Sequence, residues 1–341
     1  MIIFEQGRLQ AMNSRMHSQG IICLICGLAL LGGLVSAQKG EAGTYYVAID
    51  GSDSNPGTED QPFQTLGRGV RDLSPGDTLY VKNGTYTGSS QLAFIPSGAS
   101  WGNPVTIAAY PGHSPVIVAE QDNHVLYFSN NRYIIIDGFV IDGSNAIHGI
   151  RIHEGFGGIA DHIRIQNSEI LYAPYSGIVV TPGSDGNEFI NLQVHDNGIK
   201  DSGHGIYISS SNNIVEDCSV HDNKGWGIHV YSVTSSEVND NIVRNNEIYN
   251  NGRSGRGPGI IFSHGSGNQA YNNDIWGNIG GIQIDYSASD TYISSNTIHN
   301  NTEYGIYIGT GSINARIEFN SIYDNNGPSI INAGVLTNIL L

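Results

Sequence analysis

The stretch Gly205-Ile206-Tyr207-Ile208 decides the fold of this chain, because near-copies of it recur at intervals of 22 to 32 residues. Apolar residues alternate within each copy, which is the period of a β-strand. A second apolar position follows each copy, as Val220 does here. The seven copies begin at Gly149, Gly177, Gly205, Gly227, Gly259, Gly281 and Gly305.

A unit of this length is too thin to bury a core alone, so successive units must stack. Turn-rich composition supports short strands joined by tight turns, since the chain contains 45 glycines. The sequence therefore predicts an all-β fold, a right-handed parallel β-helix of about ten coils that stack at ~4.8 Å per coil.

Stacked coils place like residues above one another, and the sequence supplies two asparagine ladders and one ring ladder. Stacked amides hydrogen-bond from coil to coil. We interpret the histidines of the ring ladder as stack members rather than catalysts, and Cys218, which occupies an asparagine slot, as an inert buried thiol. The ladders are Asn246, Asn273, Asn296 and Asn320; Asn197, Asn223, Asn251, Asn278, Asn301 and Asn325; and His195, His221, Tyr249, Trp276, His299 and Tyr323.

Charge excludes a generic nucleic-acid binder. The 341 residues include 15 basic and 31 acidic side chains, for a net charge of −16. Binding to a phosphate backbone needs a basic surface instead. We expect no nucleic-acid partner, no organic cofactor and a monomer.

The N-terminus has the pattern of a secretory signal peptide over residues 1–37. An apolar run from Ile21 to Val35 ends in the small-residue sequence Val35-Ser36-Ala37. The run is short for a membrane span, which needs ~20 residues, although an uncleaved anchor is the alternative. We therefore expect a protein secreted to the extracellular space or periplasm, without membrane contact after cleavage. Cys218 is then the one cysteine left, so no internal disulfide is expected.

The two ends of the repeat differ from its middle. The spacing of Leu66, Val70 and Leu73 predicts a short amphipathic helix that caps the core, as a solenoid requires. We expect an N-terminal cap and first coils over 38–103, the β-helix repeats over 104–334, and a weak cap at the C-terminal end, 335–341.

Residues Tyr45–Thr58, Pro62–Leu66 and Gly76–Tyr86, together with the Gly-Ile-x-Ile coils, resemble secreted right-handed β-helix proteins. This family includes polysaccharide lyases that degrade pectate, alginate and chondroitin, and the resemblance covers nearly all of 44–330. It implies the fold and an acidic polysaccharide as substrate. The same coils occur in glycosidases and uronan epimerases, so the activity must be argued from side chains.

Outward positions of the repeat form two polar and aromatic stripes. In each Gly-Ile-x-Ile strand the isoleucines point inward and the residues between them point outward. A long strip of rings and hydrogen-bond donors suits a sugar polymer. The stripes are Arg151, Val179, Tyr207, His229, Ile261, Gln283 and Tyr307, and His153, Thr181, Ser209, Tyr231, Ser263, Asp285 and Gly309.

The turns that lead into three successive strands carry basic residues: Lys200, then Lys224, then Arg253 and Arg256. Ordinary solvated turn charges are one explanation, but on so acidic a chain we interpret them as a binding patch for a uronate polymer. Elimination needs the carboxylate neutralised, a base for the C5 proton and an acid for the leaving oxygen.

From these residues we assign roles as a hypothesis. Arg253 and Arg256 hold the carboxylate, Lys200 or His229 is the base, and Tyr231 or Tyr207 is the acid. The expected substrate-binding residues are Arg151, His153, His204, Lys224, Gln283 and Asp285.

Three other functions stay open. A glycoside hydrolase needs two carboxylates about 5–10 Å apart, whereas the outward candidates Glu154 and Asp285 lie five coils apart. A C5-epimerase shares the first proton abstraction, and a non-catalytic glycan-binding rod needs no catalytic group.

Calcium is a candidate cofactor. Residues Asp50–Asn55 alternate oxygen-bearing side chains like a calcium loop, but Gln61 stands where a bidentate glutamate would follow. We find no cluster of four aspartates like that of pectate lyases.

Overall fold

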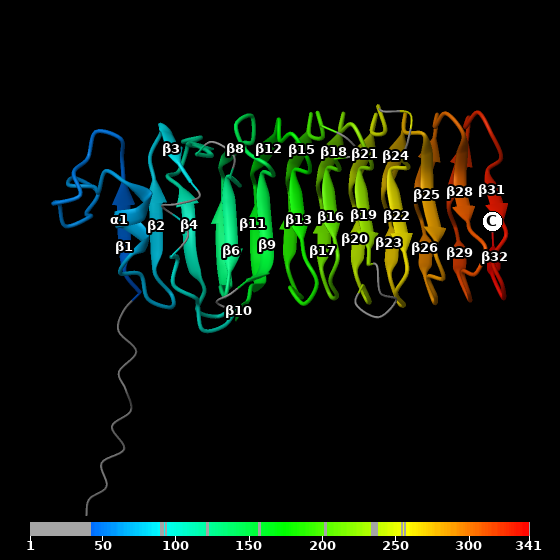
Figure 1. Cartoon of the computed structure of the whole chain (residues 1–341), viewed down its shortest axis with the longest axis horizontal. Coiled ribbons are helices and arrows are strands. Elements are labelled where there is room, and N and C mark those ends of the chain that lie inside the picture. Colours follow the sequence, from blue (N-terminus) through cyan, green and yellow to red (C-terminus); the bar gives the residue numbers. More distant parts are fainter. Residues whose placement is uncertain are drawn as a thin grey trace, which may run out of the picture. The chain divides into compact units, whose positions relative to one another are not determined.

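The computed structural model describes residues 42–340, with gaps at 89–91, 93, 121–122, 156–157, 201–202, 233–237, 254 and 256. The expected signal peptide and Arg256 lie outside the described residues. Strands of the described unit stack side by side along the chain (Figure 1). Three sheets result, with 12, 10 and 10 strands. All stacked coils pair in parallel, apart from the short antiparallel pair of β9 and β10.

Strand bounds follow the three-strand repeat. The first sheet contains β1 (Thr44–Val47), β2 (Thr78–Val81), β4 (Val105–Ala109), β7 (Arg132–Asp137), β11 (Asp161–Gln166), β14 (Glu188–Ile190), β17 (Ile214–Glu216), β20 (Ile242–Arg244), β23 (Gln269–Tyr271), β26 (Tyr292–Ser294), β29 (Arg316–Glu318) and β32 (Asn338–Leu340). The second sheet contains β3 (Thr85–Thr87), β5 (Val116–Val118), β8 (Val140–Asp142), β12 (Glu169–Leu171), β15 (Gln193–His195), β18 (Ser219–His221), β21 (Glu247–Tyr249), β24 (Asp274–Trp276), β27 (Thr297–His299) and β30 (Ser321–Tyr323).

The Gly-Ile-x-Ile copies form the third sheet. It contains β6 (Leu126–Ser129), β9 (Ile150–Gly155), β10 (Gly158–Ile159), β13 (Ile178–Val180), β16 (Ile206–Ile208), β19 (Ile228–Tyr231), β22 (Ile260–Ser263), β25 (Gly280–Asp285), β28 (Tyr304–Ile308) and β31 (Ile330–Asn332). This confirms the predicted parallel β-helix and its size of about ten coils.

Inward isoleucines of each copy form the core. Ile206 and Ile208 are fully buried, as are their neighbours on adjacent coils. The glycine before them is required by close packing, because a Cβ on Gly205 would lie 2.7 Å from the carbonyl oxygen of Gly227 and 2.8 Å from the Asn223 amide nitrogen. A larger residue there would push adjacent coils apart.

Both predicted asparagine ladders are present, and the structure adds a third. Asn197 Nδ2 donates to Asn223 Oδ1 at 3.0 Å, and Asn223 Nδ2 donates to Asn251 Oδ1 at 2.9 Å. The additional ladder follows the third sheet and was not found from the sequence; its members are Asn187, Asn213, Asn241 and Asn268. These amides satisfy the backbone where each strand turns.

Rings of the predicted stack lie nearly parallel. Centroids of His195 and His221 are 4.8 Å apart at 6°, and Tyr249 and Trp276 are 4.5 Å apart at 6°. Cys218 occupies its asparagine slot, where the Cys218 backbone N–H donates to Asn246 Oδ1. Burial raises the pKa of this thiol to about 12. The thiol is therefore protonated and unreactive, as predicted.

Helix α1 (Leu66–Val70) caps the first coil, within the segment predicted to be helical. Thr65 is its N-cap and accepts a hydrogen bond from the Arg68 N–H at 3.1 Å. Leu66 and Val70 are buried against the core. At the other end, β32 pairs with β29 and extends the first sheet, and Ile339 packs against the core.

Candidate functional site

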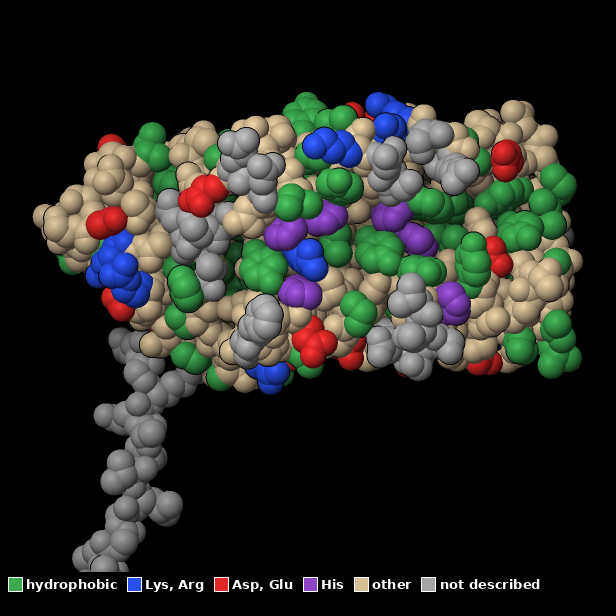
Figure 2. All heavy atoms as spheres, in the orientation of Figure 1, with side chains coloured by type: hydrophobic (Ala, Val, Ile, Leu, Met, Phe, Trp, Pro, Cys, Tyr) green, Lys and Arg blue, Asp and Glu red, His purple; other side chains and the backbone are tan. Residues whose placement is uncertain are grey.

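Register in the third sheet brings the predicted outward residues into one row. Val179 pairs with Arg151 on one side and Tyr207 on the other, and Tyr207 pairs with His229. Figure 2 shows histidine side chains gathered across the middle of one face, with a basic side chain among them. Two groups of residues on this face flank β13.

The first group, here called the arginine cluster, consists of His124, Tyr127, His148, Arg151 and His153. Tyr127 pairs with Arg151 on adjacent strands. Ring centroids of His124 and His148 are 5.4 Å apart, and those of Tyr127 and His153 are 6.1 Å apart. The cluster therefore surrounds one guanidinium with four rings.

Arg151 has no carboxylate partner within salt-bridge distance among the described residues, although the chain is strongly acidic. Of the seven other described arginines, all but Arg71 pair with Asp or Glu: Arg68, Arg132, Arg164, Arg244, Arg253 and Arg316. Arg151 Nε is also buried without a hydrogen-bond partner in the described part. An unpaired, partly buried guanidinium is a ready receptor for a carboxylate.

The histidines of the arginine cluster are held neutral. Burial, aided by the charge of Arg151, lowers the pKa of His148 to about 4. Burial lowers the pKa of His124 to about 4 as well, with further contributions from His148 and Arg151. Burial and Arg151 also lower the pKa of His153. Near neutral pH, the net positive charge of this cluster therefore comes from Arg151.

The second group, here called the ring cluster, consists of His204, Tyr207, Trp226, His229 and Tyr231. Centroids of His204 and Trp226 are 4.7 Å apart, and those of Tyr207 and His229 are 5.3 Å apart. His229 Nδ1 lies 3.4 Å from His204 Nε2. The ring cluster thus combines two imidazoles and two phenols in direct contact.

Burial shifts the pKa values of the histidines and of Tyr207 in the ring cluster in opposite directions. It lowers the pKa of His204 to about 3 and that of His229 well below its ordinary value. Burial raises the pKa of Tyr207. At neutral pH the cluster therefore holds unprotonated imidazoles beside a protonated phenol.

Small side chains on β13 separate the two clusters. Val179 on β13, with Ser176 and Thr181 on either side of that strand, lies in a lane between the larger residues of β9 and those of β16. His153 Nδ1 is 3.0 Å from Thr181 Oγ1 on the adjacent coil. Two coil spacings amount to roughly 10 Å between β9 and β16. Within that width the Val179 side chain is largely covered, at 9% exposed.

Unsatisfied polar atoms concentrate on the same face. Of the eight buried side-chain atoms without a hydrogen-bond partner in the described part, five belong to the third sheet or its adjoining turns. Such atoms are rare in folded proteins and indicate a missing partner. They are on His124, Arg151, His204, Ser263 and His264.

The basic turn residues lie at the edge of this face. Lys200 is exposed, and its backbone N–H donates to the Pro174 carbonyl at 2.7 Å. Lys224 Nζ donates to the Ile199 carbonyl at 3.0 Å. Arg253 pairs with Asp222 and, at 3.6 Å, with Asp196. The charge of Arg253 is therefore already balanced, unlike that of Arg151.

Gln283 and Asp285 lie further along the third sheet. Gln283 Nε2 donates to Asp285 Oδ2 at 3.0 Å, and the Tyr304 hydroxyl donates to Gln283 Oε1 at 2.9 Å. Register separates β25 from β9 by five coils, or roughly 24 Å. Glu154 and Asp285 are therefore too distant to act together as a hydrolase pair.

Sequence reasoning missed Trp226, His148 and His124. Trp226 and His148 directly precede a repeat glycine, as His204 does. This position also points outward and is filled by rings in several copies. The sequence could have predicted these residues as a third outward stripe, at the position directly before the glycine of each Gly-Ile-x-Ile copy.

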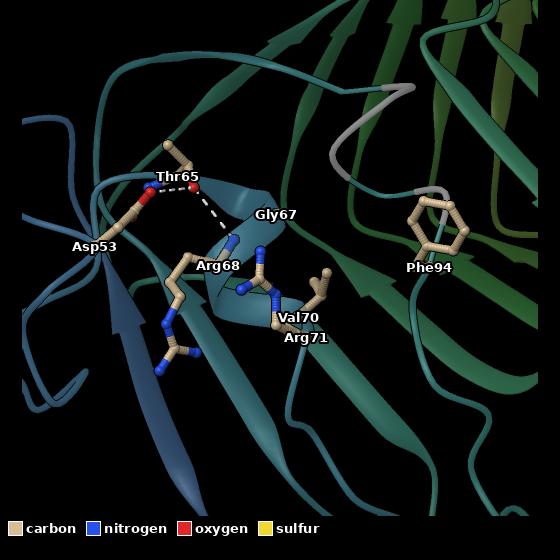
Figure 3. A pocket seen from close by; sticks show the side chains of 7 residues that line it. All are labelled: Asp53, Thr65, Gly67, Arg68, Val70, Arg71 and Phe94. Atoms are coloured by element: carbon tan, nitrogen blue, oxygen red, sulfur yellow. Dashed lines mark hydrogen bonds between the residues drawn. The ribbon is translucent and has the colours of Figure 1, made fainter.

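No group of three or more His, Cys, Asp or Glu side chains within the described ranges is arranged to hold a metal ion. The candidate calcium loop, Asp50–Asn55, has a structural role in the fold. Asp53 Oδ1 accepts hydrogen bonds from the Gln64 and Thr65 N–H groups at 2.9 Å, and Thr65 Oγ1 donates to Asp53 Oδ2 at 2.8 Å (Figure 3). The Asp53 carboxylate thus anchors the start of α1 and does not fit a calcium cage.

Comparisons with known proteins agree with this architecture. Residues 45–280 match the family model of the Pel9A-like right-handed β-helix region, and residues 232–339 match a general right-handed β-helix region. Pectate lyase PEL9 of Emericella nidulans is 26% identical over 220 residues, covering 62% of this chain and 48% of that protein. This chain thus spans about half the length of that relative.

Pectate lyase L of Dickeya dadantii is 24% identical over 319 residues, covering 87% of this chain and 72% of that protein. The crystal structure of an alginate lyase from Paenibacillus sp. str. FPU-7 superposes with a TM-score of 0.66 at 18% identity, covering 79% of this chain and 95% of that one. These matches confirm a right-handed β-helix of the polysaccharide-lyase-like kind. Within the described residues, no helix has the length and apolar character to cross a membrane.

Proposed function

Because the chain belongs to the Pel9A-like right-handed β-helix family, we propose that it is a polysaccharide lyase that cleaves a uronate-containing glycan by β-elimination. The observation that carries the proposal is the unpaired Arg151 guanidinium, separated by the β13 lane from the ring cluster. A sugar unit on this lane meets a cation on one side and proton-transfer groups on the other.

Arg151 is the carboxylate-binding residue in this mechanism. Its guanidinium offers paired donors that match a carboxylate. Neutralising the carboxylate makes the neighbouring C5 proton more acidic. Arg253 is ion-paired, so we transfer to Arg151 the role first assigned to Arg253 and Arg256.

His229 is the proposed base and Tyr207 the proposed acid. His229 takes the C5 proton, and the electron pair of that C–H bond forms the C4=C5 double bond as the C4–O4 bond breaks. The Tyr207 hydroxyl gives its proton to the leaving O4. This assignment uses the contact between the two rings, whose centroids are 5.3 Å apart. Lys200 and Tyr231 are the second candidates for base and acid.

His153, His204, Lys224, Gln283 and Asp285 are proposed to bind the polymer on either side of the reacting unit. We also propose that residues 1–37 direct secretion and are removed, which sequencing of the mature N-terminus tests. No step here passes through Ca²⁺, and a requirement for it is tested by assaying with and without added Ca²⁺.

The test is ultraviolet absorbance of the unsaturated product during incubation with polygalacturonate, alginate, chondroitin, hyaluronan and glucuronan. We expect a rise on at least one polymer, and a loss of about 10²- to 10⁴-fold in turnover for His229→Ala. Full turnover in both His229→Ala and Lys200→Ala would refute the assignment of the base. New reducing ends without unsaturation would indicate a hydrolase instead.

A flat trace with retained binding would indicate a binding rod or an epimerase. Proton exchange at C5 in deuterated water then separates these two, because an epimerase exchanges that proton and a binding rod does not.

A further inference from the structure

Rings of the ring cluster continue beyond it in an unbroken series. The centroid of Tyr231 lies 5.7 Å from that of His264, and His264 lies 5.7 Å from Tyr286 at an interplanar angle of 21°. Tyr231, Ser263 and Asp285 share one row of the third sheet. His264 and Tyr286 each follow that row by one residue. The series therefore leads from the ring cluster to the residue that follows β25, two strands before the last strand of the sheet.

The direction of the series is oblique to the coils. From His204 to Tyr286 it crosses three coil spacings, or roughly 14 Å along the axis. It also shifts by six residues along the strand direction, or roughly 20 Å. A path of roughly 24 Å is long enough for several sugar residues in a row, so it suits a polymer rather than a disaccharide.

Tyr286 ends the series as an accessible ring. Its side chain is 57% exposed, whereas Tyr207 in the ring cluster is partly buried. The face of Tyr286 stacked on His264 is covered, which leaves its other face for a ligand. An aromatic ring open on one side presents the surface on which the apolar face of a sugar stacks.

The backbone holds both residues in an uncommon conformation. His264 has φ of 69° and Tyr286 has φ of 52°, in the left-handed region where most of the described non-glycine residues are Asn or Asp. The Tyr286 N–H donates to Asp285 Oδ1 at 2.8 Å, and the His264 N–H donates to the Asp285 carbonyl at 3.3 Å. The Asp285 hydrogen bonds thus fix the position of both rings.

Two buried polar atoms beside the series lack partners in the described part of the chain. They are His264 Nδ1 and Ser263 Oγ. Both atoms are shielded from solvent, and Ser263 is fully buried, so an enclosed water rather than a sugar hydroxyl is a suitable partner for them. The aromatic series thus carries polar groups along its course, as a polysaccharide-binding surface does.

We propose that Tyr286, supported by His264, is a distal stacking subsite for the acidic polysaccharide, several sugar residues away from the bond that is cleaved. The polymer then lies obliquely across the third sheet, from the β13 lane past Tyr231 to Tyr286. This inference rests on the proposed function for the identity of the polymer. Because the subsite acts by stacking, only long substrates reach it.

The experiment compares Tyr286→Ala with Tyr286→Phe and a matched control, Tyr323→Ala. Tyr323 is 45% exposed and lies in the ring stack of the second sheet. Retardation of the intact protein in gels containing polygalacturonate or alginate measures binding without requiring turnover. KM is then measured on the polymer and on the shortest oligosaccharide that is cleaved.

We expect Tyr286→Ala to weaken polymer binding and raise KM on polymer on the order of 3- to 10-fold. The KM of Tyr286→Ala on the shortest substrate should stay near the wild-type value. Tyr286→Phe and Tyr323→Ala should bind and cleave the polymer like the wild type. If Tyr286→Ala binds and cleaves long polymer like the wild type, the subsite is refuted while the lyase stands. If the wild type cleaves no polymer, but Tyr286→Ala is the one variant that is no longer retarded in polymer-containing gels, the subsite is supported and the lyase activity is refuted. Absence of any polymer binding by the wild type overturns both.

Discussion

Replacing Arg151 by glutamine tests the charge on which the proposed site depends. Glutamine keeps polar hydrogen-bonding capacity but removes the charge and the bidentate donors. Arg151 has no carboxylate of its own to leave unpaired within the described structure, so the fold should tolerate the change. Arg132→Gln is the matched control, since Arg132 is 53% exposed and pairs with Asp161 on the first sheet.

The magnitude follows from the contact that is lost. A hydrogen bond to a charged group contributes about 1.5–3 kcal/mol. At about 1.4 kcal/mol per factor of ten, kcat/KM on the uronate polymer should fall about 10- to 150-fold. On a polymer with esterified carboxyl groups, the wild type and Arg151→Gln should differ little, because there is no anion for the guanidinium to hold.

A second readout is independent of turnover. Arg151 contributes to the lowered pKa of His148 and His124, so removing its charge should raise both values from about 4, while burial keeps them under 6.5. Histidine NMR titration measures this. The reasoning is refuted if Arg151→Gln changes neither kcat/KM on the uronate polymer nor these pKa values.

Two other predictions concern the base and the ladders. Because burial holds the pKa of His229 well below 6.5, kcat/KM should stay level as the pH falls through 6.5 and decline only at much lower pH; an acid limb centred near 6.5 would exclude His229 as the base. Asn223→Ala should lower stability by about 3 kcal/mol, because the buried amide accepts from Asn197 and donates to Asn251 and the Val194 carbonyl. Thermal unfolding measures this against Asn326→Ala, at an exposed position, and equal melting temperatures would contradict it.

The fold was predictable because a solenoid repeats one local pattern. The positions of Ile206 and its copies indicate which face of the strand points inward. The spacing of Asn223 and Asn251 indicates the register of successive coils. Pairwise contacts then follow from the repeat without knowledge of long-range topology. The third asparagine ladder escaped notice because its members, such as Asn213 and Asn241, sit outside the conspicuous phrase.

The candidate site was only partly predictable. The outward rows containing Arg151, Tyr207 and His229 follow from strand periodicity, and the structure places them as expected. Ion pairing does not follow from periodicity, because Arg253 meets Asp222 and Asp196 across turns of different lengths. A count of basic residues therefore favoured the turns, where Arg253 is ion-paired, whereas Arg151 on the strand has no carboxylate partner in the described part of the chain.

The β13 lane gives a test of substrate position that leaves every proposed catalytic group intact. Val179 is outward and lies between Arg151 and Tyr207, so Val179→Tyr places a ring where the sugar is proposed to lie. Val179 is 9% exposed, so circular dichroism and the melting temperature must first show that the Val179→Tyr protein is folded. Ile190→Tyr on the outward row of the first sheet is the matched control. We expect kcat/KM to fall at least 100-fold for Val179→Tyr and to stay near wild type for Val179→Ala, because only the larger side chain excludes a sugar ring of that size. Undiminished cleavage by a folded Val179→Tyr protein would place the reacting sugar elsewhere on the sheet.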